Sequence, residues 1–586
     1  ETYTLEKEDL VWTTTLKNTS DKKLTIADWG VPVPFNELWK YGGEIYEERV
    51  VSHSYVGEDT SYLTAQRPSG QGPYIMMSSD NKTNSGFEYQ DRWRTQEVGD
   101  TTWAWNNTNE GNWIEGLNVF YIHSEHIQKS NRGYLNNTSL VLAPGEEKTY
   151  TYRIAKVDDE KDLKEELYEN GLVDVTVTPG MIVPINQPAK IALRSKNKIK
   201  SVEAISNNDM KIKGKVKPPN VKKIGKNGDY FIYEVTFKKE HLGTNNIVVN
   251  YGKDSKMTLQ FYAIDEIASL LNTHSDFMVE KTQWDEEDGI DKNNVRYKVF
   301  DDWMMNAKNG EAPVLGKSDP EGKRNEFKGY WGWGDDWGLP HGEYLAEKNV
   351  YLPVKKEVQA VDDYLKFAIW ETLMDGHHED YLIHDFLQEE GENSTPTYRG
   401  YAYTHVYNTF FSMYQIAKQN PDLIDYHFDR KWYLETTYNI FKAMYDGPVS
   451  YNWATGTMGE LTTPQIIQAL RDEGMENEAS DLETKMEKKF ENFSSNKYPY
   501  GSEYSYDNTG EESVYTLARL NLKDDKENAL RMMKGINQKT RASRGHMPVW
   551  YYYANPVTIT GENWWNFQYT VSLAAYPMDD WIRNYA

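Results

Sequence analysis

The chain has 586 residues, enough for three or four domains that each bury a core of their own. An apolar fraction of 38% and an aromatic fraction of 14% indicate a globular protein and exclude a disordered one. A formal net charge of -25 argues against a nucleic-acid partner, because a phosphate backbone is bound by clustered Lys and Arg.

The sequence contains no cysteine, which excludes disulfides, thiol nucleophiles and zinc sites with Cys ligands. No apolar run approaches the length of a membrane span. The first residues, ETYTLEKEDLVW, are typical of a strand and not of a signal peptide. Together with the acidic composition, these features favour a bacterial protein that is secreted or displayed on the cell surface.

Residues 1–172 are built of short segments in which apolar and polar side chains alternate between Asn, Gly, Asp and Pro turns. This pattern predicts a large antiparallel β-sandwich, closed by a short charged helix near Gly171. Two aromatic and polar stretches, residues 57–76 and 87–113, are expected to leave the sheets as long excursions. They either cover the faces of the sheets or reach over the cleft of a neighbouring domain.

Residues 173–264 predict a second, smaller β unit. Their strand and turn spacing and their lysine-rich face match an immunoglobulin-like sandwich, for which we expect the role of a spacer.

An acidic loop follows at residues 284–294. Asp285, Asp288 and Asp291 would offer oxygen ligands to a structural calcium ion, but their spacing fits no EF-hand. A solvated run of charge is the preferred interpretation, and no other cofactor is expected. Adjacent His377 and His378 point apart on a helix, so we predict no metal site there either.

Residues 265–586 change to a helical period. The segment at 398–419 carries apolar side chains on two faces, with Tyr403 and Tyr407 beside Val406 and Phe410. A helix that is buried on two sides is expected in the inner ring of an (α/α) toroid. Residues 379–390 and 463–493 are also predicted to be helical, each as one segment.

This order of domains, a large N-terminal β-sandwich that leads into a helical toroid, resembles the six-hairpin glycosidase superfamily with a supersandwich domain. The resemblance covers residues 1–170 and 265–586 and rests on architecture and loop character, so no catalytic residue is transferred from it. The immunoglobulin-like unit interrupts the usual order of that superfamily. The resemblance implies a catalytic helical domain that acts on a poly- or oligosaccharide.

The glycine-rich stretch at residues 329–353 is predicted to be a shaped loop that faces a sugar. Its indoles offer flat apolar surfaces for a sugar ring, and His341 offers a polar contact beside them. The alternative is that these rings fill the core under a long loop. The predicted aromatic residues of the loop are Trp331, Trp333 and Trp337.

Glycoside hydrolysis requires one carboxyl group that donates a proton and a second that activates water or attacks the sugar. Asp335 or Asp336 is the first candidate for the acid, because burial against the neighbouring indoles would raise the pKa of its carboxyl. The second carboxylate is sought among Glu343, Glu460, Glu503, Asp507, Glu511, Glu512 and Glu562. Of these, Glu512 stands three residues after Thr509, which predicts a helix capping box and favours a structural role.

The alternative function is a polysaccharide lyase, which removes the proton α to a uronate carboxyl with Tyr or His while Asn, Arg or His neutralises that carboxylate. The segment TYRGYAYTHVYN supplies the required types, with His405 and Asn408 on one face of a helix. A third possibility is a glycan-binding surface protein without catalysis. The residues predicted to contact the glycan under these hypotheses also include Tyr398, Arg399, Trp453, Arg544, His546, Glu562 and Trp564.

Overall fold

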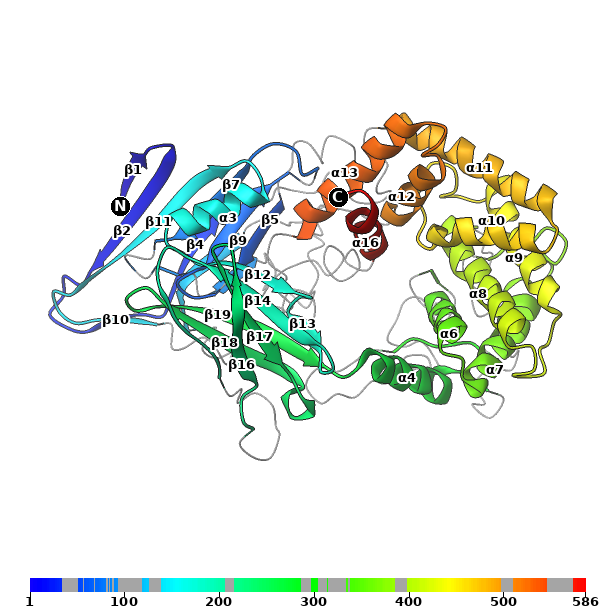
Figure 1. Cartoon of the computed structure of the whole chain (residues 1–586), viewed down its shortest axis with the longest axis horizontal. Coiled ribbons are helices and arrows are strands. Elements are labelled where there is room, and N and C mark those ends of the chain that lie inside the picture. Colours follow the sequence, from blue (N-terminus) through cyan, green and yellow to red (C-terminus); the bar gives the residue numbers. More distant parts are fainter. Residues whose placement is uncertain are drawn as a thin grey trace. The chain divides into compact units, whose positions relative to one another are not determined.

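The computed structural model describes most of the chain. The described residues are 1–33, 51–55, 57–67, 69–80, 83, 85–86, 89–92, 118–125, 139–205, 216–285, 297–303, 314, 334–335, 338–384, 398–496, 510–544 and 573–586. They divide into two compact units (Figure 1). The β unit contains residues 1–267 with 503–506 and 537–572, and the helical unit contains residues 268–502, 507–536 and 573–586.

The N-terminal part of the β unit is a sandwich of antiparallel sheets. A six-stranded sheet has the order β1-β2-β11-β7-β6-β5, and a three-stranded sheet has the order β4-β9-β8. Apolar side chains from both sheets, including Leu63, Met77 and Phe120, form one buried cluster between them. The strands of the larger sheet are β1 (Thr2–Glu6), β2 (Asp9–Lys17), β5 (Val51–Tyr55), β6 (Tyr62–Gln66), β7 (Tyr74–Ser79) and β11 (Glu147–Val157). The remaining strands are β3 (Leu24–Ile26), β4 (Asp28–Val33), β8 (Tyr89–Arg92), β9 (Asn118–Ser124) and β10 (Leu140–Leu142).

The predicted excursion at residues 57–76 is wrong for the parts of it that belong to the sheet. It contains β6, whose five residues are all buried, and it ends within β7. The alternation of apolar and polar residues is weak there because β6 is buried on both faces. The second excursion, at residues 87–113, lies largely outside the described residues.

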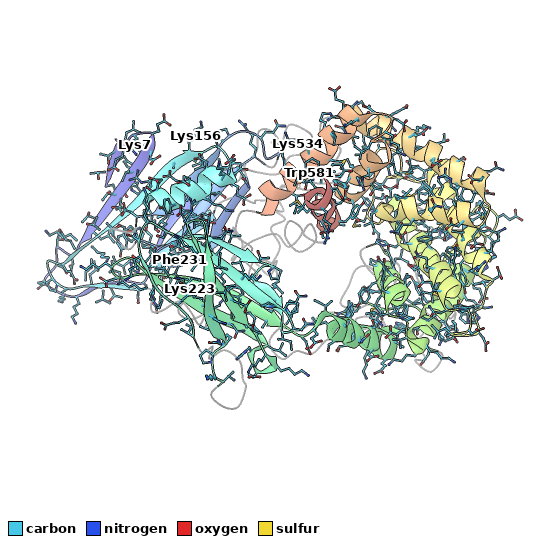
Figure 2. All side chains as sticks on the ribbon, viewed as in Figure 1. Lys7, Lys156, Lys223, Phe231, Lys534 and Trp581 are labelled. Carbon is cyan, nitrogen blue, oxygen red and sulfur yellow. The ribbon has the colours of Figure 1, made fainter. Side chains whose placement is uncertain are left out.

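The second part of the β unit is a sandwich of two four-stranded sheets, with the orders β12-β14-β17-β16 and β13-β19-β18-β15. On the sheet that contains β16 and β17, the amino group of Lys223 lies 3.9 Å from the centre of the Phe231 ring (Figure 2). The strands are β12 (Asp174–Thr178), β13 (Ile182–Pro184), β14 (Pro188–Arg194), β15 (Ile199–Ile205), β16 (Asn220–Asn227), β17 (Tyr230–Thr236), β18 (Gly243–Tyr251) and β19 (Ser255–Ile264), with a 3-10 turn at Lys239–His241.

This second sandwich shares a hydrophobic core with the N-terminal one. Leu163 and Leu167 of the helix α3 (Glu160–Glu169) and Tyr55 of β5 lie in the same buried cluster as Leu259 and Phe261 of β19. The hydroxyl of Tyr55 also donates a hydrogen bond to the carbonyl of Thr258, at 2.6 Å. The two sandwiches are therefore packed together as one unit. The predicted domain boundaries at residues 172 and 264 stay predictions.

The helical unit begins with α4 (Ile267–Phe277), and Figure 1 shows its helices following one another along an arc. Successive helices pack as pairs, with α8 against α9 and α10 against α11. The described helices are α6 (Leu339–Tyr351), α7 (Lys355–Asp363), α8 (Gly400–Gln419), α9 (Arg430–Asp446), α10 (Thr463–Asp472), α11 (Glu476–Ser494), α12 (Glu511–Leu520), α13 (Lys526–Arg544) and α16 (Ala575–Asn584), with π-helical turns at Met278–Thr282 and Tyr364–Leu373 and a 3-10 turn at Glu460–Thr462. Closure of these helices into a toroid stays a prediction.

Helix α8 confirms the prediction of burial on two sides. Of its 20 residues, 17 are buried, including the polar side chains of His405 and Asn408. Polar groups that are buried in a helix of this kind need partners inside the protein.

Three predictions of where helices begin, end or occur need correction. The loop predicted at residues 329–353 becomes helix α6 from Leu339 onward, because Gly338 adopts a φ of +90° at its start and Pro340 occupies the first turn, where a proline costs no hydrogen bond. Residues 379–384 form a turn and irregular chain instead of a helix. The segment at 463–493 is split by Gly474, whose φ of +76° ends α10.

Among the described residues, no helix combines the length and the apolar character needed to cross a membrane. Of the three aspartates that were considered for calcium, Asp285 is exposed, and Asp288 and Asp291 lie outside the described residues.

Candidate active site

The two polar side chains predicted on one face of α8 both bind Glu343 of α6. The Nδ1 atom of His405 lies 2.5 Å from Oε2 of Glu343, and Nδ2 of Asn408 donates to Oε1 at 2.9 Å. Helices α6 and α8 pack against one another, which brings together residues that are 62 positions apart in the chain. A carboxylate that holds one ring nitrogen of a histidine fixes the orientation of the ring and stabilises its protonated form.

Both polar atoms of the Asn408 side chain form hydrogen bonds at this site. Its Nδ2 also donates to the carbonyl of Gly459 at 2.9 Å, and its Oδ1 accepts from the hydroxyl of Thr462 at 2.6 Å. Gly459 has a φ of +84°, and a Cβ at this position would lie 2.7 Å from Nδ2 of Asn408. Asn408 therefore positions Glu343 and the turn at Gly459.

Glu512 of α12 supplies a buried carboxyl group next to this turn. Its Oε1 accepts a hydrogen bond from the backbone N–H of Gly459, at 3.2 Å. Burial, and then the negative charge of Glu343, raise the pKa of Glu512 to about 8, although the Gly459 N–H and, whenever it is protonated, His405 oppose the shift. Glu512 is therefore mostly protonated at pH 7. We call Glu343, His405, Asn408 and Glu512 the His405 cluster.

The predicted capping box at Glu512 is wrong. Helix α12 begins at Glu511 with Gly510 as its N-cap, so Glu512 is the second helical residue and its carboxyl faces Gly459. A sequence that contains both Thr509 and Gly510 before an apolar run does not indicate which of them begins the helix.

Glu460 forms a buried ion pair with Lys489 of α11. The amino group of Lys489 lies 2.8 Å from both carboxylate oxygens of Glu460, which also bind the hydroxyls of Tyr445 and Ser513. Burial alone would raise the pKa of Glu460, but the charge and hydrogen bonds of Lys489 outweigh it and lower the pKa. Glu460 thus has the environment of a structural carboxylate.

Tyr407 lies between these two groups of residues. Its side chain is fully buried, and its hydroxyl has no hydrogen-bond partner among the described residues. Burial, and then the charges of Glu460, Glu343 and Glu512, raise the pKa of Tyr407 well above its ordinary value. The hydroxyl therefore stays protonated and can act as a hydrogen-bond donor.

The structure gives Asp335 a cation as its neighbour, while the indoles predicted to surround it lie outside the described residues. Its Oδ2 accepts a hydrogen bond from Nε of Arg399 at 2.9 Å. The guanidinium also lies 4.8 Å from the centres of the Tyr401 and Tyr451 rings. Asp335 and Arg399 are thus brought together, and Arg399 is held by three side chains.

The other predicted contact residues lie in separate groups. The hydroxyl of Tyr398 is 3.4 Å from Nε2 of His377, and Nε2 of His341 is 2.8 Å from Asp302. The indole N–H of Trp453 donates to the carbonyl of Tyr445, which ties its ring to the environment of Glu460.

Glu511 is fully buried at the start of α12. No group of three or more His, Asp or Glu in the described part of the chain is placed to hold a metal ion. Several predicted site residues lie outside the described residues or, for Arg544, have a side chain that is not described: Trp331, Trp333, Asp336, Trp337, Glu503, Asp507, Arg544, His546, Glu562 and Trp564.

Sequence reasoning missed Lys489, and it favoured a structural role for Glu512 over a catalytic one. Lys489 stands within the apolar face of α11, with Met486 before it and Phe490 and Phe493 after it. A lysine at such a position indicates a buried acidic partner, and this signal was present in the sequence. Glu512 gave no such signal, because its neighbours come from residues 53 and more positions away.

The fold and the site define a multidomain protein in which a β-sandwich unit accompanies a helical unit with a buried cluster of carboxylates. The chain belongs to DUF5695, a family of unknown function, whose model matches residues 1–306 and 388–574. A solved structure described as a polysaccharide lyase shares the fold, with a TM-score of 0.69 and 17% sequence identity over 94% of this chain and 70% of the other. No curated protein matches the chain.

Proposed function

We propose that this protein is a polysaccharide lyase that cleaves a uronate-containing glycan by β-elimination at the His405 cluster. The observation that carries the proposal is the pairing of His405 with Glu343 next to the protonated carboxyl of Glu512. The polysaccharide lyase of the same fold supports this choice over hydrolysis. Secretion or surface display would suit an enzyme that acts on a polymeric glycan.

In the proposed reaction, His405 removes the proton from C5 of the uronate, the carbon next to the carboxyl group. The electrons of the C5–H bond form a double bond between C4 and C5, and the bond from C4 to the glycosidic oxygen breaks. The leaving oxygen takes up the proton that His405 has removed, either directly or through water, and becomes a hydroxyl, which returns His405 to its neutral form. Glu343 binds Nδ1 of His405, so Nε2 is the ring nitrogen that would take the C5 proton.

Removal of the C5 proton places negative charge on the uronate carboxylate, and this charge has to be stabilised. A protonated carboxyl group can donate a hydrogen bond to it, as an ionised one cannot. Glu512 is held in the protonated form by its burial and by the charge of Glu343. We therefore assign to Glu512 the role of donor to the substrate carboxylate.

The first test is digestion of a panel of uronate-containing polysaccharides, with the ultraviolet absorbance of the 4,5-unsaturated product as the readout. His405→Ala should lower the rate by roughly 10²–10⁴-fold, the range for loss of a general base. His378→Ala is the matched control, because the ring of His378 is engaged by Trp370 outside the cluster. An H405A variant that keeps nearly full activity would contradict the assignment.

Glycoside hydrolysis is the second candidate, and Glu512 is the observation that favours it. A general acid must be protonated at the working pH while a second carboxylate stands nearby, and Glu512 and Glu343 meet this description. A hydrolase would release reducing ends without an unsaturated product. Binding of the glycan without either product would indicate a non-catalytic protein.

A further inference from the structure

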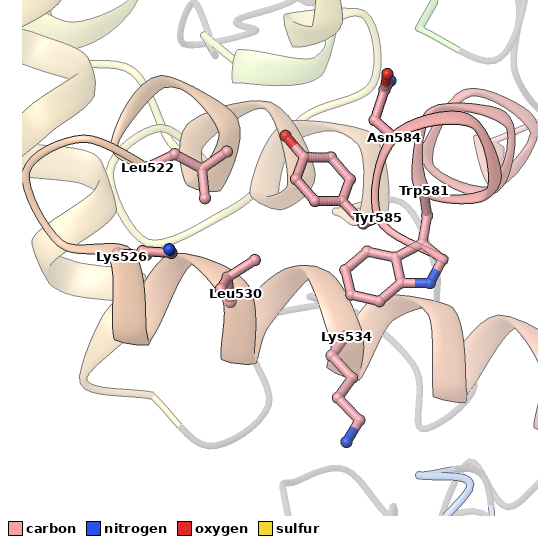
Figure 3. A pocket seen from close by; sticks show the side chains of 7 residues that line it. All are labelled: Leu522, Lys526, Leu530, Lys534, Trp581, Asn584 and Tyr585. Carbon is pink, nitrogen blue, oxygen red and sulfur yellow. The ribbon is translucent and has the colours of Figure 1, made fainter.

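A hollow lies between α13, α16 and the segment that follows α12. Its lining residues all belong to the helical unit. The hollow has a volume of about 720 Å³ (Figure 3). Helix α13 contributes Lys526, Leu530 and Lys534, which recur every four residues and so share one face of the helix. Helix α16 contributes Trp581, and its C-cap residue Tyr585, four positions later, follows on the same side.

Trp581 and Tyr585 form an aromatic wall of the hollow. The rings of Trp581 and Tyr585 are stacked, with centres 5.5 Å apart and planes inclined by 27°. The hydroxyl of Tyr585 accepts a hydrogen bond from Nη1 of Arg519, which also pairs with Asp580 at 3.0 Å. Both rings are only half-buried, so part of each faces the hollow. Two aligned aromatic faces suit the C–H face of a sugar ring.

The opposite wall is basic. Lys526 and Lys534 are exposed, and no ion pair joins either of them to an acidic side chain of the described residues. Figure 3 shows Lys526 beside Leu530 along the hollow, while Lys534 extends from the same helix away from Trp581. Among the described residues, no Asp or Glu lines the hollow, although the chain has 90 of them against 65 Lys and Arg. This local excess of positive charge favours an anionic ligand.

We propose that this hollow is a second glycan-binding site, separate from the His405 cluster, for a saccharide that carries a carboxylate or sulfate group. Trp581 and Tyr585 stack on the sugar ring, and the lysines of α13 neutralise its acidic group. A neutral sugar would use the aromatic wall but not the lysines. The proposal concerns binding alone and does not depend on the reaction proposed for His405.

The test measures binding of three short oligosaccharides of equal length by calorimetry: an oligouronate, a sulfated oligosaccharide and a neutral one. The chain carries His405→Ala throughout, so that a cleavable probe is not consumed. K526Q/K534Q should weaken binding of an acidic probe roughly tenfold at low salt, and added salt should reduce the difference. The uronate and sulfate arms distinguish the two acidic groups.

The matched control is K355Q/K442Q, which removes two exposed lysines of the same unit that no ion pair joins to described acidic residues. It should bind the probes as the H405A chain does. Trp581→Ala should abolish binding at the hollow, and the lysine variants decide the question if that variant does not fold. Equal affinity of K526Q/K534Q and its control, equal affinity for the neutral probe, or no binding of any probe would each overturn the proposal. A failure of β-elimination with preserved binding would overturn only the function proposed for His405.

Discussion

Two buried glutamates of the helical unit show how residue environment separates chemical roles. Glu460 and Glu512 are both nearly inaccessible to water. Glu460 has Lys489 within 2.8 Å, while Glu512 has a single backbone N–H donor and the negative charge of Glu343. The first is an ionised structural group, and the second is a carboxyl that holds its proton at neutral pH.

The raised pKa of Glu512 predicts a pH-dependent loss of stability. The folded protein binds this proton up to about pH 8, whereas the unfolded chain releases it near pH 4.5. The stabilisation is thus complete below pH 4.5 and is lost as the pH rises to about 8, a change of about 3–5 kcal/mol. Glu512→Gln should remove this dependence, as measured by denaturant unfolding from pH 5 to about pH 9. Parallel pH profiles of the two proteins would contradict the shift.

Removal of one partner from the Glu460–Lys489 pair predicts a large loss of stability. Lys489→Met leaves the Glu460 carboxylate buried without its counter-charge, which should cost about 3–5 kcal/mol in the free energy of unfolding. The double variant K489M/E460Q should recover much of this loss, because no uncompensated charge remains. Equal stability of the single and double variants would show that the pair is not buried as described.

At the scale of elements, sequence periodicity was sufficient to predict a regular helix. It was insufficient to predict which distant residues pack against that helix. The two apolar faces of residues 398–419 predicted a helix buried on both sides, and α8 confirms it. The glycines and the single proline at 329–340 obscured the start of α6, since these residue types occur both in loops and in the first turn of a helix. Glu343 and His405 were both singled out as candidates, but their pairing depends on the packing of α6 against α8, which no local pattern encodes.

The contact of α6 with the π-helical segment Tyr364–Leu373 provides a test of how closely α6 packs against its neighbours. A Cβ on Gly342 would lie 2.3 Å from Cε1 of Tyr364, far inside the contact distance. Glycine to alanine within a free helix stabilises by about 1 kcal/mol, but here Gly342→Ala should destabilise by about 1–3 kcal/mol. Thermal unfolding measures the difference.

The matched variant is Gly180→Ala, for which no heavy atom lies within 4 Å of the added Cβ and which should leave the melting temperature nearly unchanged. Tyr364→Leu, combined with G342A, should relieve part of the clash. A stabilised G342A variant would show that α6 and the Tyr364 segment do not approach as closely as described.

At the scale of the whole molecule, the chain separates a β unit with a continuous core from a helical unit that holds the candidate site. The sequence predicted both kinds of domain and the change of period near residue 265. It also predicted an immunoglobulin-like spacer, but the structure joins this segment to the N-terminal sandwich through α3 and β19. The lysine-rich surface dominated the sequence pattern and concealed the apolar side chains that make the contact.

This shared core predicts that one substitution weakens both sandwiches together. Leu167→Ala removes a side chain that is 1% exposed and should cost about 2–5 kcal/mol. Hydrogen exchange should then accelerate in β6 and in β19 alike, because both border the damaged core. Leu5→Ala, at a side chain that is 74% exposed, makes the same chemical change and should alter neither strand. Faster exchange in β19 alone would show that the two sandwiches unfold independently.

The same core limits what protein engineers could do with residues 173–264. Immunoglobulin-like segments are often treated as cassettes that can be cut out or transplanted. Excision here would leave Val157, Leu163 and Leu167 of the remaining chain facing water. A shortened chain would need new polar residues at those three positions before it could stay in solution.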